Sequence, residues 1–330
     1  MKFPRLLVTG GLGFIGSNFI HHMFHKFNGT DHSKCCPEHE KYPYNGDFID
    51  FEIMNVDCLT YAGKKENLVG IDHLDNYYHS NANITDFEKM KEIFESFRPT
   101  AVIHFAAESH VDRSISSGLE FVKSNVLGTQ ILLDLARRFD VELFFHISTD
   151  EVYGSMDEGL ADEQYRLFPS SPYSASKASS DLLVLSHFHT YGTPVIISRC
   201  SNNFGPRQHE EKLVPKMISR ASKDQELPIY GSGKQIRNWI HVKDHCEAIV
   251  MLMERGNIGE IYNIAGDEEV SNIDLVRNII LSLGRTEGLI KHVEDRPGHD
   301  FRYGLDGQKL REMGWSPKIT LKDGLDDLIS

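Results

Sequence analysis

Two adjacent carboxylates precede a tyrosine and a lysine that are spaced as Tyr-x-x-x-Lys. The carboxylates are Asp150 and Glu151, and the pair that follows is Tyr173 and Lys177. Residues at this spacing stand one helical turn apart on the same face, and an ammonium beside a phenol favours the phenolate. We therefore expect Lys177 to lower the pKa of Tyr173 and to make it a general base. The four residues together predict an enzyme that moves more than one proton.

The elements around these residues favour a functional interpretation. Asp150 and Glu151 follow the apolar segment Leu143–Ser148, which reads as a strand, and open α/β sheets bind ligands beyond the carboxyl ends of their strands. Taken alone, a Tyr-x-x-x-Lys pair is common in helices as a packed ring beside a solvated lysine. The run from Thr149 to Glu151 is equally typical of a helix N-terminus. The combination, together with a nucleotide-binding signature upstream, argues against both of these structural interpretations.

A glycine turn lies between the first strand and the first helix. The apolar run Leu6–Thr9 leads into Gly10, Gly13 and Gly16, and a helix begins near Ser17. Strand, glycine turn and helix in this order are the context that dinucleotide binding requires. The glycines permit a tight turn, close approach to a pyrophosphate and packing of helix on strand, while N–H groups at the helix N-terminus bind the anion. The spacing is Gly-x-x-Gly-x-x-Gly, one residue longer than the usual form.

An acidic residue ends the second expected strand. Phe51–Val56 runs into Asp57, where a carboxylate accepts ribose hydroxyls and repels a 2′-phosphate, so NAD is favoured over NADP. Asp57 lies much further past Gly16 than the roughly 20 residues that are usual. The excess is the polar stretch Asn28–Asp50, which predicts a surface insertion. Its cysteines and histidines fit no standard zinc spacing, so we expect no metal site.

Strands and helices alternate over the first 200 residues or so. Further strands are expected at Ala101–Phe105 and Pro194–Ser198, and helices at Asp86–Phe97, Phe121–Phe139 and Ala175–Tyr191. This alternation predicts an α/β fold with a doubly wound parallel sheet of the Rossmann type.

The alternation becomes irregular near residue 200, where Gly and Pro interrupt the pattern. We therefore expect a nucleotide-binding domain over residues 1–199, with a return segment at 236–256, and a smaller C-terminal α/β substrate domain over residues 200–330. The active site should lie in the cleft between them.

Nearly the whole chain resembles the extended short-chain dehydrogenase/reductases, and among them the nucleotide-sugar 4,6-dehydratases. The segments that carry the resemblance include Thr9–Ser17, Val56–Gly63, Ile147–Gly154, Ser171–Asp181 and Asp295–Asp300. The Thr-Asp-Glu run is the discriminating piece, because related epimerases and decarboxylases usually carry other residues there. The resemblance implies a lyase that removes water from dTDP-glucose or UDP-glucose, with NAD as cofactor and a 4-keto-6-deoxy sugar nucleotide as product.

The resemblance also implies a role for each catalytic residue, namely Thr149, Asp150, Glu151, Tyr173 and Lys177. Tyr173 takes the proton of the sugar 4-hydroxyl while C4 gives a hydride to NAD. Glu151 then removes the C5 proton, and a protonated Asp150 protonates the departing 6-hydroxyl before hydride returns to C6. Two neighbouring carboxylates discourage simultaneous ionisation, which allows one of them to keep its proton.

Binding residues follow from the resemblance position by position. Those expected at NAD are Gly10, Gly13, Phe14, Ile15, Gly16, Asp57, Cys58, Leu59, Thr60, Asn83, Ile84, Phe105, Ala106, Ala107, Ser124, Tyr173, Lys177 and Asn203. Those expected at the sugar nucleotide are Ser109, Thr149, Asn202, Lys212, Leu213, Pro228, Tyr230, Arg237, Asn272, Arg296 and His299. The cations among the second set would meet the diphosphate. Asn83 departs from the family, which usually has an aspartate there to accept from the adenine amino group; an amide oxygen also accepts, without charge.

Composition excludes several classes of partner. The chain has 330 residues and a net charge of -13, which argues against nucleic acid. No apolar run approaches the length of a membrane span. Five cysteines, an odd number, and a nucleotide-binding turn that begins by Gly10 favour reduced thiols and a cytoplasmic enzyme.

The resemblance also implies a homodimer. The helices expected at Phe121–Phe139 and Ala175–Tyr191 would pair across a two-fold axis. Both carry more apolar positions than one sheet face can bury, and the examples are Leu132, Leu135, Leu182 and Leu185.

Two other functions are compatible with parts of the pattern. One is an NAD-dependent sugar-nucleotide 4-epimerase, against which the Thr-Asp-Glu run argues. The other is a non-catalytic NAD(H)-binding regulator, against which the intact Asp150, Glu151, Tyr173 and Lys177 argue. The sequence does not decide between a thymidine and a uridine nucleotide, because the thymine methyl contributes only about 1 kcal/mol of hydrophobic discrimination over uracil.

Overall fold

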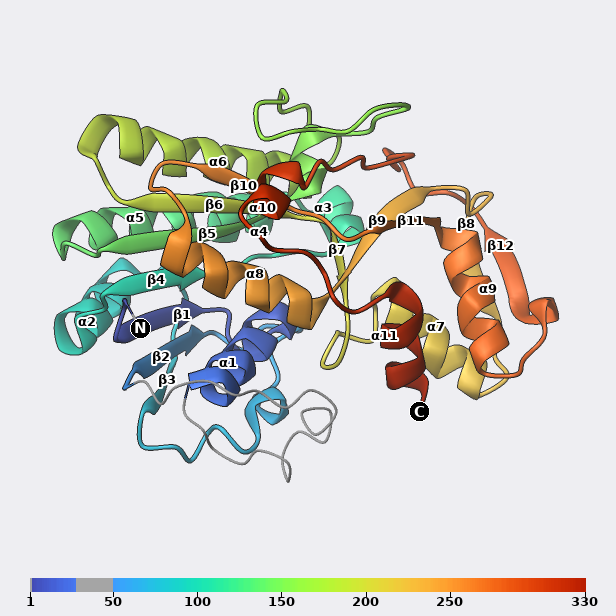
Figure 1. Cartoon of the computed structure of the whole chain (residues 1–330), viewed down its shortest axis with the longest axis horizontal. Coiled ribbons are helices and arrows are strands. Elements are labelled where there is room, and N and C mark those ends of the chain that lie inside the picture. The colour runs from blue at the N-terminus through green and yellow to red at the C-terminus, as the bar shows by residue number, and fades with distance from the viewer. Residues whose placement is uncertain (1, 28–49) are drawn as a thin grey trace.

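A seven-stranded parallel sheet forms the larger part of the molecule (Figure 1). The structure is a computed structural model that describes residues 2–27 and 50–330. The strand order is β10-β6-β5-β4-β1-β2-β3, and every neighbouring pair is parallel. The strands are β1 (Arg5–Thr9), β2 (Glu52–Asp57), β3 (Tyr77–Asn81), β4 (Ala101–His104), β5 (Leu143–Thr149), β6 (Val195–Cys200) and β10 (Ile261–Ile264). The order reverses direction beside β1, which confirms the predicted doubly wound sheet.

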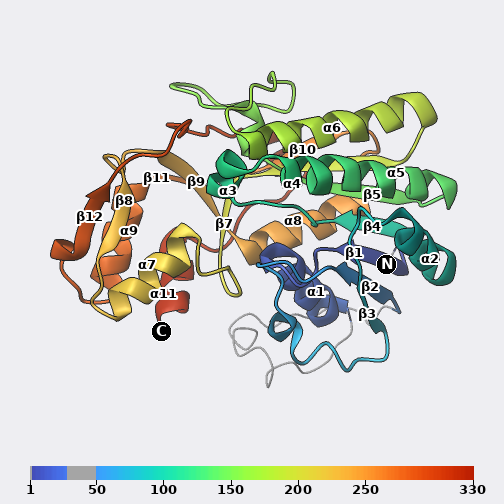
Figure 2. The ribbon, with the colours of Figure 1, turned by 180° about the vertical axis from the view of Figure 1, so that it is seen from behind.

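Helices cover both faces of this sheet, so its central strands β1, β4, β5 and β6 are buried along almost their whole length. On one face lie α1 (Phe14–Phe27) and α8 (Val242–Arg255), which pack together. The other face carries α2 (Phe87–Phe97), α5 (Thr129–Arg138) and α6 (Pro172–Tyr191), as Figure 2 shows from behind. Burial on both faces makes the sheet a rigid platform for whatever its carboxyl edge carries.

The start of α6 is fixed by its own sequence. Ser171 and Ser174 form a capping box, and Pro172 occupies the first helical turn, where its missing N–H costs nothing. Tyr173 therefore lies in the first turn of a 20-residue helix, close to the carboxyl end of β5.

A second, smaller group of elements follows residue 200. It contains a three-stranded sheet in the order β11-β9-β7 and a two-stranded sheet, β12-β8. Its elements are β7 (Asn202–Phe204), β8 (Leu227–Tyr230), β9 (Ile236–His241), β11 (Glu268–Ser271), β12 (Ile290–Val293), α7 (Leu213–Ser222), α9 (Asn272–Ser282) and α11 (Leu321–Ile329). Their buried side chains, among them Phe204, Met217 and Ile279, form a separate core.

The chain crosses between the two groups more than once. Within the expected return segment, β9 pairs in the small sheet, whereas α8 packs on the large one. The chain then contributes β10 to the large sheet, so the return reaches Ile264. The remaining short elements are α3 (Val111–Ser116), α4 (Leu119–Phe121), α10 (Gln308–Glu312) and the helical turns Lys65–Leu68, Val122–Gly128, Asp150–Tyr153 and Glu287–Leu289.

Several expectations need correction. The single helix expected at Phe121–Phe139 is α4, a π-helical turn at Val122–Gly128 and then α5. The strand β3 was not expected, because its sequence Tyr-Tyr-His-Ser-Asn has little apolar pattern. Leu132 and Leu135, expected in a dimer contact, are fully buried in the core of their own chain.

Two expectations concern features that the structure describes only in part. The insertion Asn28–Asp50, with its cysteines and histidines, lies outside the described residues except for Asp50. In residues 2–27 and 50–330, no helix is both long and apolar enough to span a membrane, and no group of histidines, cysteines and acids could hold a metal ion.

A buried ion pair joins α6 to β6. Arg199 Nε donates to Asp181 Oδ2 at 2.9 Å, and Arg199 also donates to the hydroxyl of Tyr153 at 2.9 Å. Asp181 is fully buried and Arg199 is 2% exposed. Removing one partner of such a pair leaves the other charge without compensation.

We predict that Arg199→Met lowers the free energy of unfolding by about 3 kcal/mol, because it leaves Asp181 buried and unpaired. Urea titration at neutral pH measures this. Lys322→Met is the control, since Lys322 and Asp326 form an exposed pair on α11 and its loss should change stability little. Equal effects of the two substitutions would contradict the account of this ion pair.

Candidate active site

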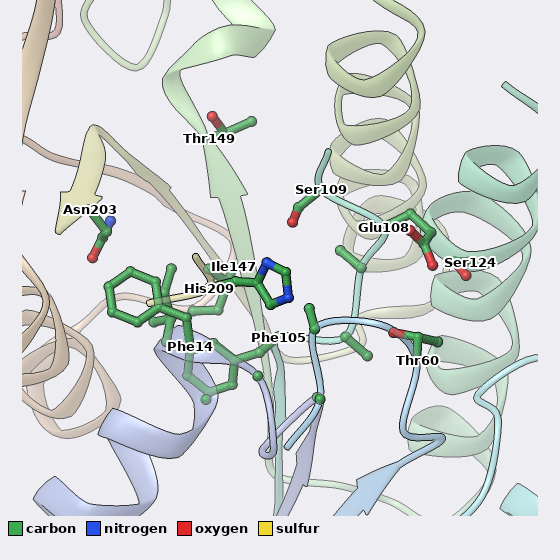
Figure 3. Close-up of a pocket in the computed structure, with 18 of the residues that line it drawn as sticks. Phe14, Thr60, Phe105, Glu108, Ser109, Ser124, Ile147, Thr149, Asn203 and His209 are labelled. Atoms are coloured by element: carbon green, nitrogen blue, oxygen red, sulfur yellow. The ribbon is translucent and has the colours of Figure 1, made fainter. Parts of the chain in front are cut away.

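A cavity opens at the carboxyl edge of the large sheet, where the strand order reverses (Figure 3). Its walls come from the β1–α1 turn, the ends of β2, β4, β5 and β6, and the segment that follows β6. All five predicted catalytic residues line it, and so does every predicted cofactor residue except Leu59. The structure thus brings together side chains that are far apart in the sequence.

The glycine turn fits a pyrophosphate. Gly10 has a positive φ of 72°, and a Cβ at Gly10 would collide with the backbone of Ala106. A Cβ at Gly16 would collide with the carbonyl oxygen of Gly10. Only glycine allows the turn, β4 and the start of α1 to approach this closely. The resulting cradle, at the N-terminus of a 14-residue helix, has the form that dinucleotide phosphates require.

Asp57 is held by the same turn. Its Oδ2 accepts from the N–H of Leu12 at 2.9 Å, and its Oδ1 accepts from the N–H of Leu59 at 2.8 Å. A carboxylate has about four acceptor positions, so both oxygens can still accept from ribose hydroxyls. Asn83, in contrast, already accepts through Oδ1 from both the N–H and the hydroxyl of Thr85. Acceptance from adenine would compete with those bonds.

The two carboxylates end β5 in different surroundings. Asp150 is 3% exposed, and burial together with the neighbouring Glu151 raises its pKa to about 8. Thr149 Oγ1 donates to Asp150 Oδ1 at 3.1 Å, while Asp150 Oδ2 has no hydrogen-bond partner among the described residues. Asp150 is therefore a neutral acid at pH 7, with its second oxygen available for a ligand.

Glu151 lies beside Asp150 but faces cations. Burial raises the pKa of Glu151, and the charges of Arg237, Arg296 and Lys212 oppose this increase. Its backbone N–H donates to Thr149 Oγ1 at 3.2 Å, so Thr149 binds the carboxyl group of Asp150 and the backbone of Glu151. The site therefore pairs a proton-carrying acid with a neighbour whose ionised form is supported by positive charge.

Tyr173 and Lys177 do not interact as the sequence spacing predicts. Lys177 Nζ donates to the carbonyl of Ile147 at 2.7 Å and lies 3.4 Å from His146 Nε2. Burial raises the pKa of Tyr173 well above its usual value, and the charge of Glu151 adds to this. The expectation that Lys177 lowers this pKa is therefore wrong for the chain alone, because the lysine side chain turns towards β5. Burial lowers the pKa of Lys177 to about 8.

The predicted substrate residues fall into two groups. The first group lines the cavity and consists of Ser109, Thr149, Asn202 and Lys212. The second group lies outside the cavity lining and consists of Leu213, Pro228, Tyr230, Arg237, Asn272, Arg296 and His299.

Asp112 accepts hydrogen bonds from two residues of the second group. The hydroxyl of Tyr230 donates to Asp112 Oδ2 and a guanidinium nitrogen of Arg296 donates to Asp112 Oδ1, both at 3.2 Å. The ring of His299 packs edge-on against Tyr230 with 6.2 Å between centroids. These side chains form one polar cluster that joins α3 to the small group of elements.

Arg237 donates its hydrogen bonds to backbone carbonyl groups and not into the cavity. The residue is 5% exposed, and its guanidinium donates to the carbonyl oxygens of Ile236, Asp300 and Phe301. It also stacks over the ring of Tyr303 at 4.3 Å. Its charge reaches Glu151, but the donors expected to meet a diphosphate are directed at backbone carbonyls.

Sequence reasoning missed several residues in the cavity lining and beside it. Glu211 Oε2 lies 3.2 Å from His110 Nε2 and 3.6 Å from Arg113, whose guanidinium stacks over Tyr61 at 3.6 Å. Of these four residues, only Tyr61 and Glu211 line the cavity. Further missed lining residues are Glu108, Ser148, Cys200, Gln208 and His209. The available signal was their position next to predicted cofactor and substrate residues along the chain.

Comparison with known proteins identifies the family of the chain. The family model described as GDP-mannose 4,6 dehydratase matches residues 46–328. The low-salt glycan biosynthesis protein Agl12 of Haloferax volcanii is 43% identical over 97% of this chain and 96% of its own length. The dTDP-glucose 4,6-dehydratase of Streptomyces niveus is 42% identical over 98% of this chain and 91% of its own.

A solved structure superposes on nearly the whole chain. The dTDP-glucose 4,6-dehydratase of Streptomyces venezuelae, with NAD bound, has a TM-score of 0.88 and 41% identity. The superposition covers 98% of this chain and 95% of that one. With the family model and the relatives at this level of identity, the chain belongs to the nucleotide-sugar 4,6-dehydratases of the GDP-mannose 4,6 dehydratase family.

Proposed function

We propose that this protein is an NAD-dependent lyase that converts dTDP-glucose to its 4-keto-6-deoxy derivative and water. The observation that carries the proposal is the pair Asp150 and Glu151, a neutral acid beside a cation-supported base, in the cavity that also holds the dinucleotide cradle. The similar proteins named as dTDP-glucose 4,6-dehydratases support the substrate.

The chain supplies three proton-transfer groups for this reaction. The glycine turn and Asp57 would hold NAD, which would supply the hydride acceptor for C4 and the hydride donor for C6. Tyr173 takes the proton of the 4-hydroxyl, Glu151 takes the proton from C5, and Asp150 gives its proton to the departing 6-hydroxyl. When hydride returns to C6, Glu151 gives a proton back to C5, and the proton that Tyr173 took replaces the one that Asp150 gave. The protons therefore balance, and the cofactor and all three side chains end in their starting states. Each group acts from a fixed position at the edge of the sheet.

Tyr173 can act as a base only if a positive charge lies close to its hydroxyl, since burial keeps the phenol protonated in the chain alone. Lys177 is one turn away on the same helix. With a pKa of about 8, Lys177 is charged at neutral pH. The proposed reaction requires the ammonium to turn from the carbonyl of Ile147 towards the phenol.

A 4-epimerase is the alternative within the same fold. Epimerisation needs only oxidation and reduction at C4, so a proton donor such as Asp150 beside a base such as Glu151 would have no part in it. Product analysis distinguishes the two functions. We expect incubation with dTDP-glucose to yield a 4-keto-6-deoxy product. A parallel incubation with UDP-glucose measures the preference for thymine over uracil. A product inverted at C4 that keeps its 6-hydroxyl would replace this proposal with the epimerase.

We predict that Glu151→Gln stops the reaction after oxidation of C4. The amide cannot take the C5 proton, whereas Tyr173 and the cradle are unchanged, so reduced cofactor should accumulate on the enzyme. Stopped-flow absorbance of the reduced nicotinamide measures this, with turnover lower by roughly a hundredfold or more. Glu142→Gln, an exposed position far from the cavity, is the control. Wild-type product formation by Glu151→Gln would remove this residue from its role.

We predict an alkaline limit to turnover that originates from Asp150. Its raised pKa means that the acid carries its proton below about pH 8 and loses it above, so dehydration should decline as the pH rises through that value. Asp150→Asn should abolish dehydration and leave the oxidation of C4 intact, because the amide cannot give a proton. The pH profile and single-turnover cofactor reduction measure both. An Asp150→Asn enzyme with full turnover would contradict the assignment.

We also propose that the enzyme is a homodimer, which rests on the family resemblance and on an apolar surface. Leu119, Val122, Leu127, Leu182 and Tyr191, on α4, the π-helical turn and α6, are between 48% and 61% exposed. A second copy of the chain is the proposed occupant of this surface. Light scattering should give twice the chain mass, and Leu182→Glu should shift the mass towards the monomer. A monomer mass for the unaltered protein at micromolar concentration would refute the dimer.

A cytoplasmic location is part of the same proposal. The cysteines in the described residues, Cys58, Cys200 and Cys246, are all free thiols. Free thiols, two of them buried, suit a reducing compartment.

A further inference from the structure

The part of the cavity beyond Asp57 is lined by the residues that follow β3. The strands β2 and β3 are parallel, and Asp57 pairs with Asn81 where the two strands end. Ala82, Asn83 and Ile84 come next along the chain and line the cavity at the same carboxyl edge. Only Asn83 among these three has a polar side chain. Its amide is therefore the side-chain group that can hydrogen-bond a ligand beside them.

The adenine of a bound dinucleotide belongs in this part of the cavity. The glycine turn fits the pyrophosphate, and both oxygens of Asp57 can still accept from hydroxyl groups of the adenosine ribose. The ribose carries the phosphate and the base on opposite ends. The base therefore extends from Asp57 away from the glycine turn, towards the residues that follow β3. We call the part of the cavity lined by Ala82, Asn83 and Ile84 the adenine subsite.

Thr85 holds the amide of Asn83 in one orientation. Asn83 Oδ1 accepts from the backbone N–H of Thr85 at 3.0 Å and from its hydroxyl at 2.9 Å. A backbone N–H can only donate, so the end of the amide that faces it must be the oxygen. The two ends of an asparagine amide are often hard to tell apart, but here the N–H of Thr85 identifies them.

The remaining hydrogen-bonding capacity of this amide can be counted. A carbonyl oxygen has two lone pairs, and Thr85 occupies both of them. The amide nitrogen takes no part in these two bonds and can only donate. An asparagine with both ends free binds adenine by accepting from the 6-amino group and donating to N7. Asn83 keeps only the donating half of that pattern.

The turn around Asn83 opposes any reorientation of the amide. The backbone carbonyl of Asn83 accepts from the N–H of Asp86 at 2.9 Å. Asp86 is in turn the N-cap of α2, and its side chain accepts from the N–H of Lys89 at 3.1 Å. Rotation of the amide to free its oxygen would break both bonds to Thr85 at the entry to this helix. The donor is therefore what the chain presents to a bound purine.

We propose that Asn83 makes the adenine subsite indifferent to the 6-amino group of adenine, because it presents a donor where recognition of that group needs an acceptor. A dinucleotide whose purine lacks this amino group should then bind nearly as well as NAD. Asn83 is exposed, so the amino group keeps water as its acceptor and its removal costs little. The inference rests on NAD as the cofactor and is independent of the sugar nucleotide.

One substitution exchanges the donor for an acceptor without a change of size. Asn83→Asp keeps an oxygen for the two bonds from Thr85 and replaces the amide nitrogen by a second oxygen, which can accept from the amino group. Asn81→Asp is the matched control. It adds the same charge two residues earlier, at an exposed position at the end of β3 and outside the cavity lining.

The measurement is a competition for the cofactor site of the full chain, without any sugar nucleotide. Radiolabelled NAD is displaced in equilibrium dialysis by unlabelled NAD or by nicotinamide purine dinucleotide, which has hydrogen in place of the amino group and keeps N1, N3 and N7. The ratio of the two dissociation constants gives the preference for NAD, and any change in overall affinity cancels in this ratio.

We expect the unaltered protein to prefer NAD by less than about threefold, because no protein acceptor meets the amino group. Asn83→Asp should prefer NAD by about fivefold or more, since a hydrogen bond to a charged acceptor is gained only with the amino group present. Asn81→Asp should keep the ratio of the unaltered protein.

Three outcomes would overturn the proposal. A preference of the unaltered protein for NAD by about fivefold or more would mean that the amino group is recognised. An unchanged ratio in Asn83→Asp would mean that residue 83 does not face position 6 of the purine. An equal gain in Asn81→Asp and Asn83→Asp would make the effect one of charge alone. Failure of the proposed function is separate, because it would appear as an absence of dehydration while the binding ratios stayed the same.

Discussion

The withdrawal of Asp150 from water is the constraint on which the site depends. A carboxylate at the end of a strand in solution would be ionised and could not give a proton at pH 7. Buried beside Glu151, Asp150 keeps its proton up to about pH 8. This requires a strand that is buried along its whole length, and β5 is such a strand. The covering of both faces of the sheet is therefore needed for the raised pKa of Asp150 as well as for the stability of the fold.

The segments after residue 200 supply positive charges near the carboxylates that the large sheet itself does not provide. Lys212, Arg237 and Arg296 come from segments after residue 200, and their positive charges support the ionised form of Glu151. Arg237 does so while it binds backbone carbonyls of residues 300 and 301. The difference between the two carboxylates therefore arises where the two groups of elements meet. A change that separates them would weaken Glu151 as a base before it disturbed the cofactor cradle.

Local sequence rules predicted the features that local physics controls. The glycine turn follows from steric limits at Gly10 and Gly16, and the start of α6 follows from a serine cap and a proline, so both can be read from the chain. The strand β3 has no apolar alternation, and its place at the edge of the sheet explains why it needs none. The π-helical turn has no sequence signature, yet it lets Asn125 bond both the backbone of Glu108 and the hydroxyl of Ser176.

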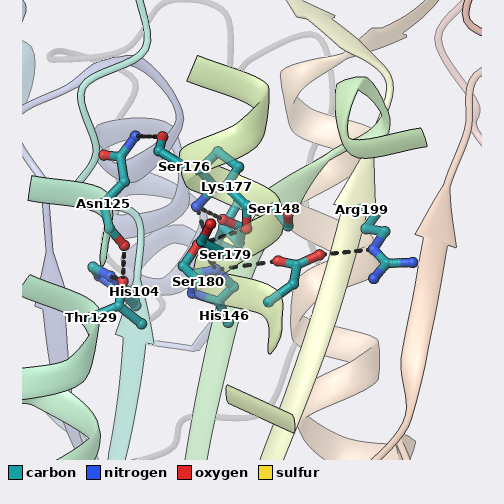
Figure 4. A network of polar contacts seen from close by, with 12 residues as sticks. His104, Asn125, Thr129, His146, Ser148, Ser176, Lys177, Ser179, Ser180 and Arg199 are labelled. Carbon is teal, nitrogen blue, oxygen red and sulfur yellow. Dashed lines mark hydrogen bonds and ion pairs between the residues drawn. The ribbon is translucent and has the colours of Figure 1, made fainter. Parts of the chain in front are cut away.

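The direction of a long side chain could not be predicted. Helical spacing places Tyr173 and Lys177 on one face, but it does not say that the lysine turns to Ile147 and His146. Those partners are on the strand β5 and become neighbours of α6 only in the folded chain (Figure 4). The same holds for Arg237, which was expected at a phosphate and lies against carbonyl groups. Site membership was thus easier to predict than site geometry.

The most direct test of the central claim follows the hydrogens at C5 and C6 of the sugar. The account separates a base, Glu151, from an acid, Asp150, and returns to C6 the hydride that left C4. With dTDP-glucose that carries deuterium at C4, in ordinary water, the product should carry that deuterium at C6. With ordinary substrate in deuterated water, the product should carry solvent deuterium at C5. Deuterium that remains at C4 of a product that still has its 6-hydroxyl, with no solvent label at C5, would contradict the account.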